Sequence, residues 1–257
     1  MCLQRTVGRN IFCSVKINNS ASYLYAMSSS LIPILEKNKH SFHPVVPFDA
    51  VTDRLLQMDF TEANKSLTKE VIEDVAKFST YVDQQLSDAN ALYGIGGYAE
   101  HRTVYSRSNV FDASDGGEPR RLHLGTDIWG KAGTPVFAAL GGMVHSFKFN
   151  NRYGDYGATI VLLHQLESAA FYTLYGHVNL KDLALVEGQY INRGQEFAHF
   201  GEPHENGHWP PHLHFQIISD IELNEGDYPG VCRMSDKSFY LKNCPDADLI
   251  LQMNQFL

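Results

Sequence analysis

Three short motifs in the middle of the chain place side chains that can bind a metal ion at strand-like spacings. His123 and Asp127 stand four residues apart with Gly125 midway, and His212 and His214 stand two apart. Alternate residues of a strand face the same side, so each pair is expected to share a face, with Gly125 leaving space for an ion. Two imidazoles and one carboxylate are typical of a catalytic zinc site, in which water takes the fourth position.

A third motif, Tyr175-Gly-His177, closes an aromatic stretch and supplies a further imidazole. Zinc acidifies its bound water and polarises a carbonyl group, and a neighbouring histidine can take the proton. Eight of the twelve histidines fall between residues 145 and 214, and histidine is the commonest metal ligand near neutral pH. A single histidine is usually a surface or core residue, but three such motifs in one chain predict metal-assisted hydrolysis.

The segment His204-Glu-Asn-Gly-His208 also matches the HExxH pattern of helical zinc proteases. That pattern needs a helix, because helical residues four apart present both imidazoles on one side. Here Pro203 precedes the motif, Gly207 lies inside it, and Trp209-Pro-Pro follows it. These residues are signals for turns, so we expect a loop beside the predicted site.

Short β-rich runs separated by Gly, Pro and Asn must position these motifs. Several short strands at this spacing predict an antiparallel sheet or sandwich. Two stretches, 133–144 and 187–198, look alike, and this duplicated pattern resembles that of the lipoyl-like hybrid fold. The expected class is therefore mainly β, with an α-helical segment before it, and the expected strands are residues 135–139, 143–149, 159–164, 171–175, 195–200 and 213–218.

The region before the β-rich part has a different pattern. Apolar residues recur at intervals of three and four from Ser66 to Leu92, which predicts one amphipathic helix of about 26 residues, ended by the glycines of 94–97. We expect three parts in the chain. These are an unstructured leader or misassigned start over 1–26, with Met27 as the alternative start, a helical segment over 27–95, and a β-rich catalytic domain over 96–257 with its core at 120–218 and a C-terminal extension.

Composition excludes several classes of protein. The chain has 21 Lys and Arg against 29 Asp and Glu, a net charge of −8, which disfavours nucleic-acid binding because phosphates need clustered cations. It has no apolar run of about 18 residues and no readable signal peptide, so a soluble cytoplasmic protein is the default expectation, with the cell envelope or secretion by another route as the alternative. Cys232 and Cys244 are expected to be free buried thiols, with one bridge between them as the alternative.

In their order along the chain, the motifs at 123–127, 175–177 and 212–215 resemble the lysostaphin-type zinc endopeptidases, which cleave peptides in bacterial peptidoglycan. The flanking glycine pattern is similar as well, and the resemblance covers about residues 120–218. It implies one zinc ion per chain, held by His123, Asp127 and His214. It also implies that His212 is the general base or the hydrogen-bond partner of the attacking water, and that His177 stabilises the oxyanion or shares the base role.

The resemblance implies peptidoglycan stem peptides or cross-bridges as substrate, cut at glycyl or D-alanyl bonds. Two alternatives are a non-catalytic module that binds cell wall or activates an enzyme, and a histidine phosphotransfer-like domain, which leaves Asp127 unexplained. Segments 98–102 and 226–246 fall outside the family core and are expected to shape the cleft. Asn109 is a further candidate, as a latency residue in the open metal position. The oligomeric state is left open.

Overall fold

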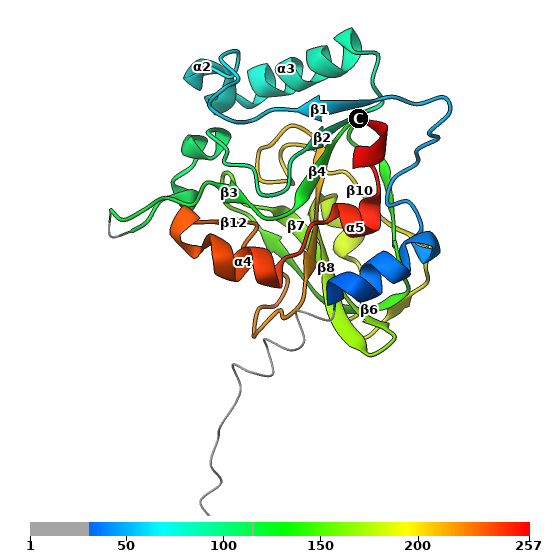
Figure 1. Cartoon of the computed structure of the whole chain (residues 1–257). Coiled ribbons are helices and arrows are strands. Elements are labelled where there is room, and N and C mark those ends of the chain that lie inside the picture. Colours follow the sequence, from blue (N-terminus) through cyan, green and yellow to red (C-terminus); the bar gives the residue numbers. More distant parts are fainter. Residues whose placement is uncertain (1–30, 115) are drawn as a thin grey trace, which may run out of the picture.

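The computed structural model describes residues 31–114 and 116–257, and strands dominate it (Figure 1). The strands are β1 (Leu55–Met58), β2 (Tyr93–Gly96), β3 (Leu122–His123), β4 (Thr126–Trp129), β5 (Pro135–Phe137), β6 (Gly142–Asn150), β7 (Gly157–Leu166), β8 (Ala169–Val178), β9 (Tyr190–Ile191), β10 (Glu196–His199), β11 (His212–Ile218) and β12 (Val231–Cys232). The α-helices are a first helix over residues 31–37, α2 (Lys69–Glu73), α3 (Val75–Asp88), α4 (Lys237–Asn243) and α5 (Asp248–Leu251). The short 3-10 helices are η1 (Lys39–Ser41), η2 (Val104–Arg107), η3 (Asn109–Phe111), η4 (Leu180–Leu183), η5 (Met234–Asp236) and η6 (Asn254–Phe256).

Eight of the strands form one sheet in the order β1-β2-β4-β11-β8-β7-β6-β9, and the pairs β10-β5 and β12-β3 form two small sheets. Within the large sheet every pairing is antiparallel except that of β1 with β2. The predicted mainly β class is therefore confirmed. The six strands expected from the sequence are present as β5, β6, β7, β8, β10 and β11. The other strands are at most four residues long, too short to show a clear alternation. The single strand expected through His123 and Asp127 is divided into β3 and β4.

The two similar stretches of sequence pair with each other. Val136 of β5 lies opposite Ala198 of β10, and Gly142 at the start of β6 lies opposite Ile191 of β9. The apolar side chains of Val136, Ala198 and Ile191 are all buried in the main hydrophobic core. The duplication that the sequence indicates is thus a pair of interlocked strand segments in the structure.

The segment before the β-rich part differs from the single helix that the sequence predicts. The helix divides at Asp74, whose side chain accepts hydrogen bonds from the backbone N–H groups of Ala76 and Lys77 and so caps the start of α3. Residues Tyr93–Gly96 do not end a helix but form the buried strand β2, between β1 and β4. The range 27–95 is therefore mixed, and α2 and α3 lie beyond β1 at one edge of the sheet (Figure 1). The leader expected over 1–26, and Met27, lie outside the described residues.

Strand β11 shows how the sheet separates core from site. Leu213, Phe215 and Ile217 point into the main hydrophobic core, as period-two alternation requires, and each is fully buried. His212 and His214 point to the opposite side. Burial of each of these apolar side chains stabilises the fold by about 1.5–3 kcal/mol, which fixes the register that aims the histidines.

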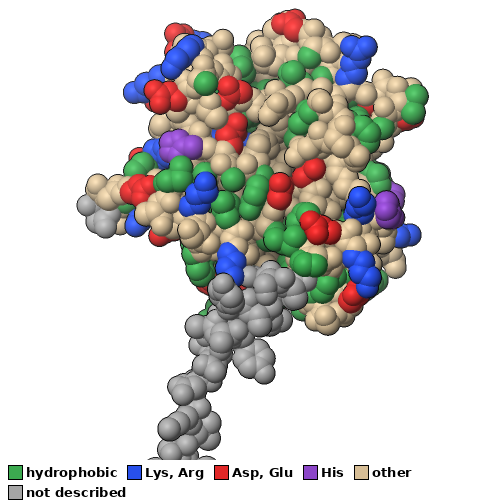
Figure 2. Space-filling model, viewed as in Figure 1, with side chains coloured by type: hydrophobic (Ala, Val, Ile, Leu, Met, Phe, Trp, Pro, Cys, Tyr) green, Lys and Arg blue, Asp and Glu red, His purple; other side chains and the backbone are tan. Residues whose placement is uncertain are grey.

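The remaining expectations concern the surface and the cysteines. Cys232 and Cys244 are buried and free, as expected. No helix among residues 31–114 and 116–257 is long and apolar enough to span a bilayer. Figure 2 shows acidic and basic side chains interspersed on the face in view.

Candidate metal site

Two antiparallel strands place two of the three predicted ligands opposite one another. β4 pairs with β11 so that Asp127 lies across from His214, and Trp129 lies across from His212. Asp127 Oδ1 is 3.0 Å from Nδ1 of His214, and both side chains are buried. The register of this one strand pair therefore brings a carboxylate and an imidazole together.

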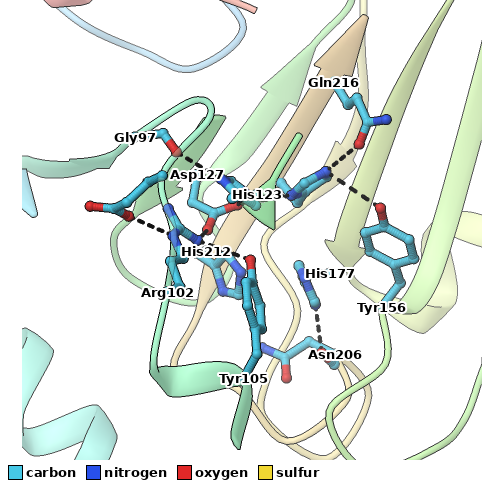
Figure 3. A network of polar contacts seen from close by, with 12 residues as sticks. Gly97, Arg102, Tyr105, His123, Asp127, Tyr156, His177, Asn206, His212 and Gln216 are labelled. Atoms are coloured by element: carbon cyan, nitrogen blue, oxygen red, sulfur yellow. Dashed lines mark hydrogen bonds and ion pairs between the residues drawn. The ribbon is translucent and has the colours of Figure 1, made fainter. Parts of the chain in front are cut away.

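The third predicted ligand comes from a different sheet. His123 belongs to β3, which pairs with β12, and the chain enters β4 only at Thr126. The expectation that His123 and Asp127 share one strand face is therefore wrong, because the strand is interrupted between them. Nε2 of His123 nevertheless lies 3.0 Å from Nδ1 of His214 and 3.3 Å from Oδ1 of Asp127 (Figure 3). The structure thus brings all three predicted ligands together.

The donor set fits a zinc ion. Bonds of about 2.0–2.1 Å to a tetrahedral zinc ion place neighbouring ligand atoms about 3.3 Å apart, close to the observed 3.0, 3.0 and 3.3 Å. Nδ1 of His123 donates to the carbonyl oxygen of Gly97, and Nε2 of His214 donates to Oε1 of Gln216. With these tautomers the two inner nitrogens face each other with lone pairs, which is repulsive unless a cation lies between them.

The charges of the site suit a cation as well. Burial alone would raise the pKa of Asp127, but the neighbouring His123 and the Arg102 guanidinium hold it well below its usual range. Burial lowers the pKa of His123 to about 4. At neutral pH the site therefore presents an ionised carboxylate and a neutral imidazole, which are the protonation states that metal binding requires.

Gly125 has a different role from the one expected. A Cβ atom there would lie 2.6 Å from Cε1 of His214 and 2.7 Å from the carbonyl oxygen of Phe215, so the imidazole fills the space instead of an ion. Gly125→Ala should therefore displace His214 and weaken zinc binding by at least about 10–100-fold, measured by competition with a chelator.

Gly133→Ala is the matched control, because a Cβ at Gly133 meets nothing within 4 Å, although its φ of +77° makes the substitution strained. This variant should lose some stability and keep its affinity for zinc. Equal zinc affinity in Gly125→Ala and the wild type would show that the His214 imidazole can move without weakening zinc binding.

The other two predicted histidines lie side by side next to the ligands. The ring centroids of His177 and His212 are 4.1 Å apart. Nδ1 of His177 donates to the carbonyl oxygen of Asn206, and Nδ1 of His212 donates to the carbonyl oxygen of Pro210. Each of these hydrogen bonds is 2.7 Å long. Both Nε2 atoms are thereby left as proton acceptors. Trp129 stacks on the His212 ring at 3.9 Å between centroids and fixes its plane.

Burial makes both of these imidazoles neutral. Burial lowers the pKa of His212 to about 4, and burial together with the neighbouring His212 and His214 lowers that of His177 well below its usual value. A neutral imidazole with a free Nε2 can accept a proton at neutral pH. The pair can therefore serve as general base.

The HExxH segment forms turns, as predicted from its Pro and Gly residues. His204 is exposed, whereas the buried Glu205 carboxylate accepts hydrogen bonds from the backbone N–H groups of Leu180 and Glu202. Asn206 is fully buried, and its carbonyl oxygen holds His177. This segment therefore contributes to the site by positioning His177. None of its side chains belongs to the ligand cluster found among the described residues.

A pocket with a cavity of about 190 Å³ opens over the site. Its walls include Arg102 from the segment 98–102, and Asp227 and Tyr228 from the segment 226–246. These flanks shape the cleft, as expected from the sequence. Asn109 is exposed and is not among the described residues that line the pocket, so its expected place at the metal position is not supported by the structure.

Sequence reasoning missed the residues that hold the ligands. Gln216 follows His212 and His214 at the same period of two, and that spacing could have identified it. The Gly97 carbonyl carries no signal in the sequence. Arg102 could be recognised only from the fold, because it is 25 positions before the carboxylate it contacts.

Comparison with known proteins finds a matching family model and a similar curated protein. Residues 121–225 match the family model of peptidase family M23. An L-Ala–D-Glu endopeptidase of Bacillus subtilis (strain 168) is 31% identical over 132 residues, which are 49% of this chain and 39% of that protein. This chain thus matches well under half of that relative's length.

Solved structures of peptidases are also similar. A zinc-containing peptidase from Vibrio cholerae matches with 28% identity and a TM-score of 0.32, over 41% of this chain and 29% of that one. The catalytic domain of lysostaphin from Staphylococcus simulans matches with 20% identity and a TM-score of 0.37, over 63% of this chain and 96% of that one. Residues 121–225, which contain the three ligand candidates and both neighbouring histidines, form a peptidase family M23 domain.

Proposed function

We propose that this chain is a zinc-dependent metalloendopeptidase that hydrolyses peptide bonds in peptidoglycan stem peptides or cross-bridges. His123, Asp127 and His214 hold one zinc ion per chain, which supplies a Lewis acid and an acidified water molecule. The observation that carries this proposal is the pair of neutral imidazoles with free Nε2 atoms, next to three converging ligand atoms inside a peptidase domain.

The two remaining histidines do the proton transfer. His212, clamped between the Pro210 carbonyl and the Trp129 ring, takes the proton of the attacking water at Nε2. His177 shares the base role, since its Nε2 is also an acceptor while Asn206 holds its Nδ1. Once protonated, either imidazole can donate to the oxyanion or to the leaving amine, so no covalent intermediate with the protein is needed.

The substrate is proposed from the resemblance and from the curated relative. That relative's name specifies the bond between L-Ala and D-Glu, and the lysostaphin-type resemblance implies glycyl or D-alanyl bonds. Purified protein with zinc should therefore be incubated with muropeptides that contain the stem and its cross-bridge, and with oligoglycine peptides, and the products identified by mass spectrometry.

We expect new amino and carboxyl termini in at least one substrate, and none with His212→Ala or excess chelator. Failure to cut any of these substrates, with His212→Ala indistinguishable from the wild type, would refute the enzyme proposal. Binding of cell-wall peptides under the same conditions would then favour the non-catalytic module.

A further inference from the structure

We propose that Arg102, which lies outside the matched peptidase segment, is a positioning residue that makes Asp127 bind the metal through one oxygen only. Asp127 Oδ1 faces His123 and His214, whereas Oδ2 accepts a hydrogen bond from Nη1 of Arg102 at 2.5 Å (Figure 3). The inference rests on the proposed zinc site and adds a residue to it.

The guanidinium is held from several sides and is itself only 1% exposed. Its Nε donates to Oε2 of Glu100 at 2.6 Å, and its Nη1 also donates to the hydroxyl of Tyr105 at 3.3 Å. The Cζ atom of Arg102 lies 5.3 Å from the Phe60 ring centroid. Nη2 has no hydrogen-bond partner among the described residues and would lie 2.7 Å from a Cβ atom on Gly96.

Backbone contacts place Arg102 before any side-chain contact does. Its N–H donates to the carbonyl oxygen of Arg121, and the preceding His101 forms a bridge with Leu122 at the start of β3. The segment before the core is therefore fastened to the strand that carries His123. The backbone segments that carry Arg102 and His123 are thus hydrogen-bonded to each other.

The consequence for Asp127 follows from the chemistry of carboxylates. The terminal torsion of an aspartate is soft, so a free Oδ2 could swing toward the metal and take a second coordination position. A charge-assisted hydrogen bond from a fixed guanidinium opposes that rotation. Arg102 thereby keeps open the fourth position, which the attacking water needs.

Cobalt(II) substitution tests this directly, because four-coordinate cobalt absorbs visible light far more strongly than five- or six-coordinate cobalt. Arg102→Met should still bind cobalt, but its visible absorption should fall severalfold as Asp127 chelates through both oxygens. Its kcat on a cleaved peptide should fall about 10–100-fold, with a smaller change in KM.

Gly96→Ala is the second variant, in case Arg102→Met does not fold. It keeps every charge and pushes Nη2 away from its place, so it should shift the cobalt spectrum in the same direction. Arg107→Met is the matched control, since Arg107 is also buried but packs on Trp209 and bonds to the Tyr153 hydroxyl. Its cobalt spectrum should equal that of the wild type.

Three outcomes overturn the proposal. If Arg102→Met and Gly96→Ala, or the one of them that folds, show the cobalt absorption of the wild type, the guanidinium does not control coordination. If Arg107→Met shows an equal change in absorption, the effect is common to buried arginines and not specific to Arg102. The spectrum needs no turnover, so a protein that cleaves nothing still gives an answer. A wild type that binds no cobalt would refute the zinc site, and the positioning role with it.

Discussion

His212→Ala should lower the rate of peptide hydrolysis by about 10²–10⁴-fold while the protein keeps its zinc. The substitution removes the Nε2 acceptor next to the metal site, but none of the three ligand atoms. His177→Ala should have the same kind of effect, because its ring lies 4.1 Å away and has the same free nitrogen. The checks are kcat on a cleaved muropeptide and zinc content on the same sample.

The double variant tells whether the two imidazoles act as a unit. If they share the base role, the loss in the double variant should be far smaller than the product of the two single losses. Full turnover in either single variant would remove that histidine from the mechanism. Loss of zinc together with turnover would instead make it a ligand.

The second large effect is on stability. Zinc that binds only the folded chain at about 1,000 times its Kd stabilises it by about 4 kcal/mol. At about 2–4 °C of Tm per kcal/mol for a chain of this size, a chelator should lower the wild-type Tm by roughly 8–16 °C. Without chelator, Asp127→Ala should have a lower Tm than the wild type, because among the described residues it leaves the buried Arg102 with Glu100 as its one acidic contact. Its Tm should not respond to the chelator.

Asp182→Ala is the control for this experiment. Asp182 also contacts a histidine, His199, but both lie away from the ligand cluster. This variant should keep the full response to chelator by differential scanning fluorimetry. A chelator effect of equal size in Asp127→Ala would place the metal at other residues.

The β-rich core could be predicted from the sequence because its long strands are β-rich runs bounded by Gly, Pro and Asn. β6, β7, β8 and β11 are seven to ten residues long, and each contains a run of apolar and β-branched residues long enough to be recognised. The strands β1 and β2 could not be recognised, since each has four residues and the glycines of 93–96 are typical of a helix end. Pairing of β2 with β4, and of β1 with β2, decided their conformation.

The candidate site was predicted at the level of residue types, and its geometry was not. The motifs gave His123, Asp127 and His214, but the interruption at Gly125 and the origin of His123 in a second sheet depend on pairing with β12, more than a hundred residues away. Arg102 is the clearest gap, because a lone arginine in a loop is usually solvated. Its burial between two carboxylates exists only in the folded chain.

The most direct test of the zinc site is the zinc content per chain, measured by elemental mass spectrometry on the wild type, Asp127→Ala and His208→Ala. The geometry predicts about one zinc ion in the wild type and in His208→Ala, and little in Asp127→Ala. His208 belongs to the HExxH-like loop and is not in the ligand cluster. Loss of zinc in His208→Ala with retention in Asp127→Ala would contradict the His123, Asp127 and His214 site and place the metal on that loop.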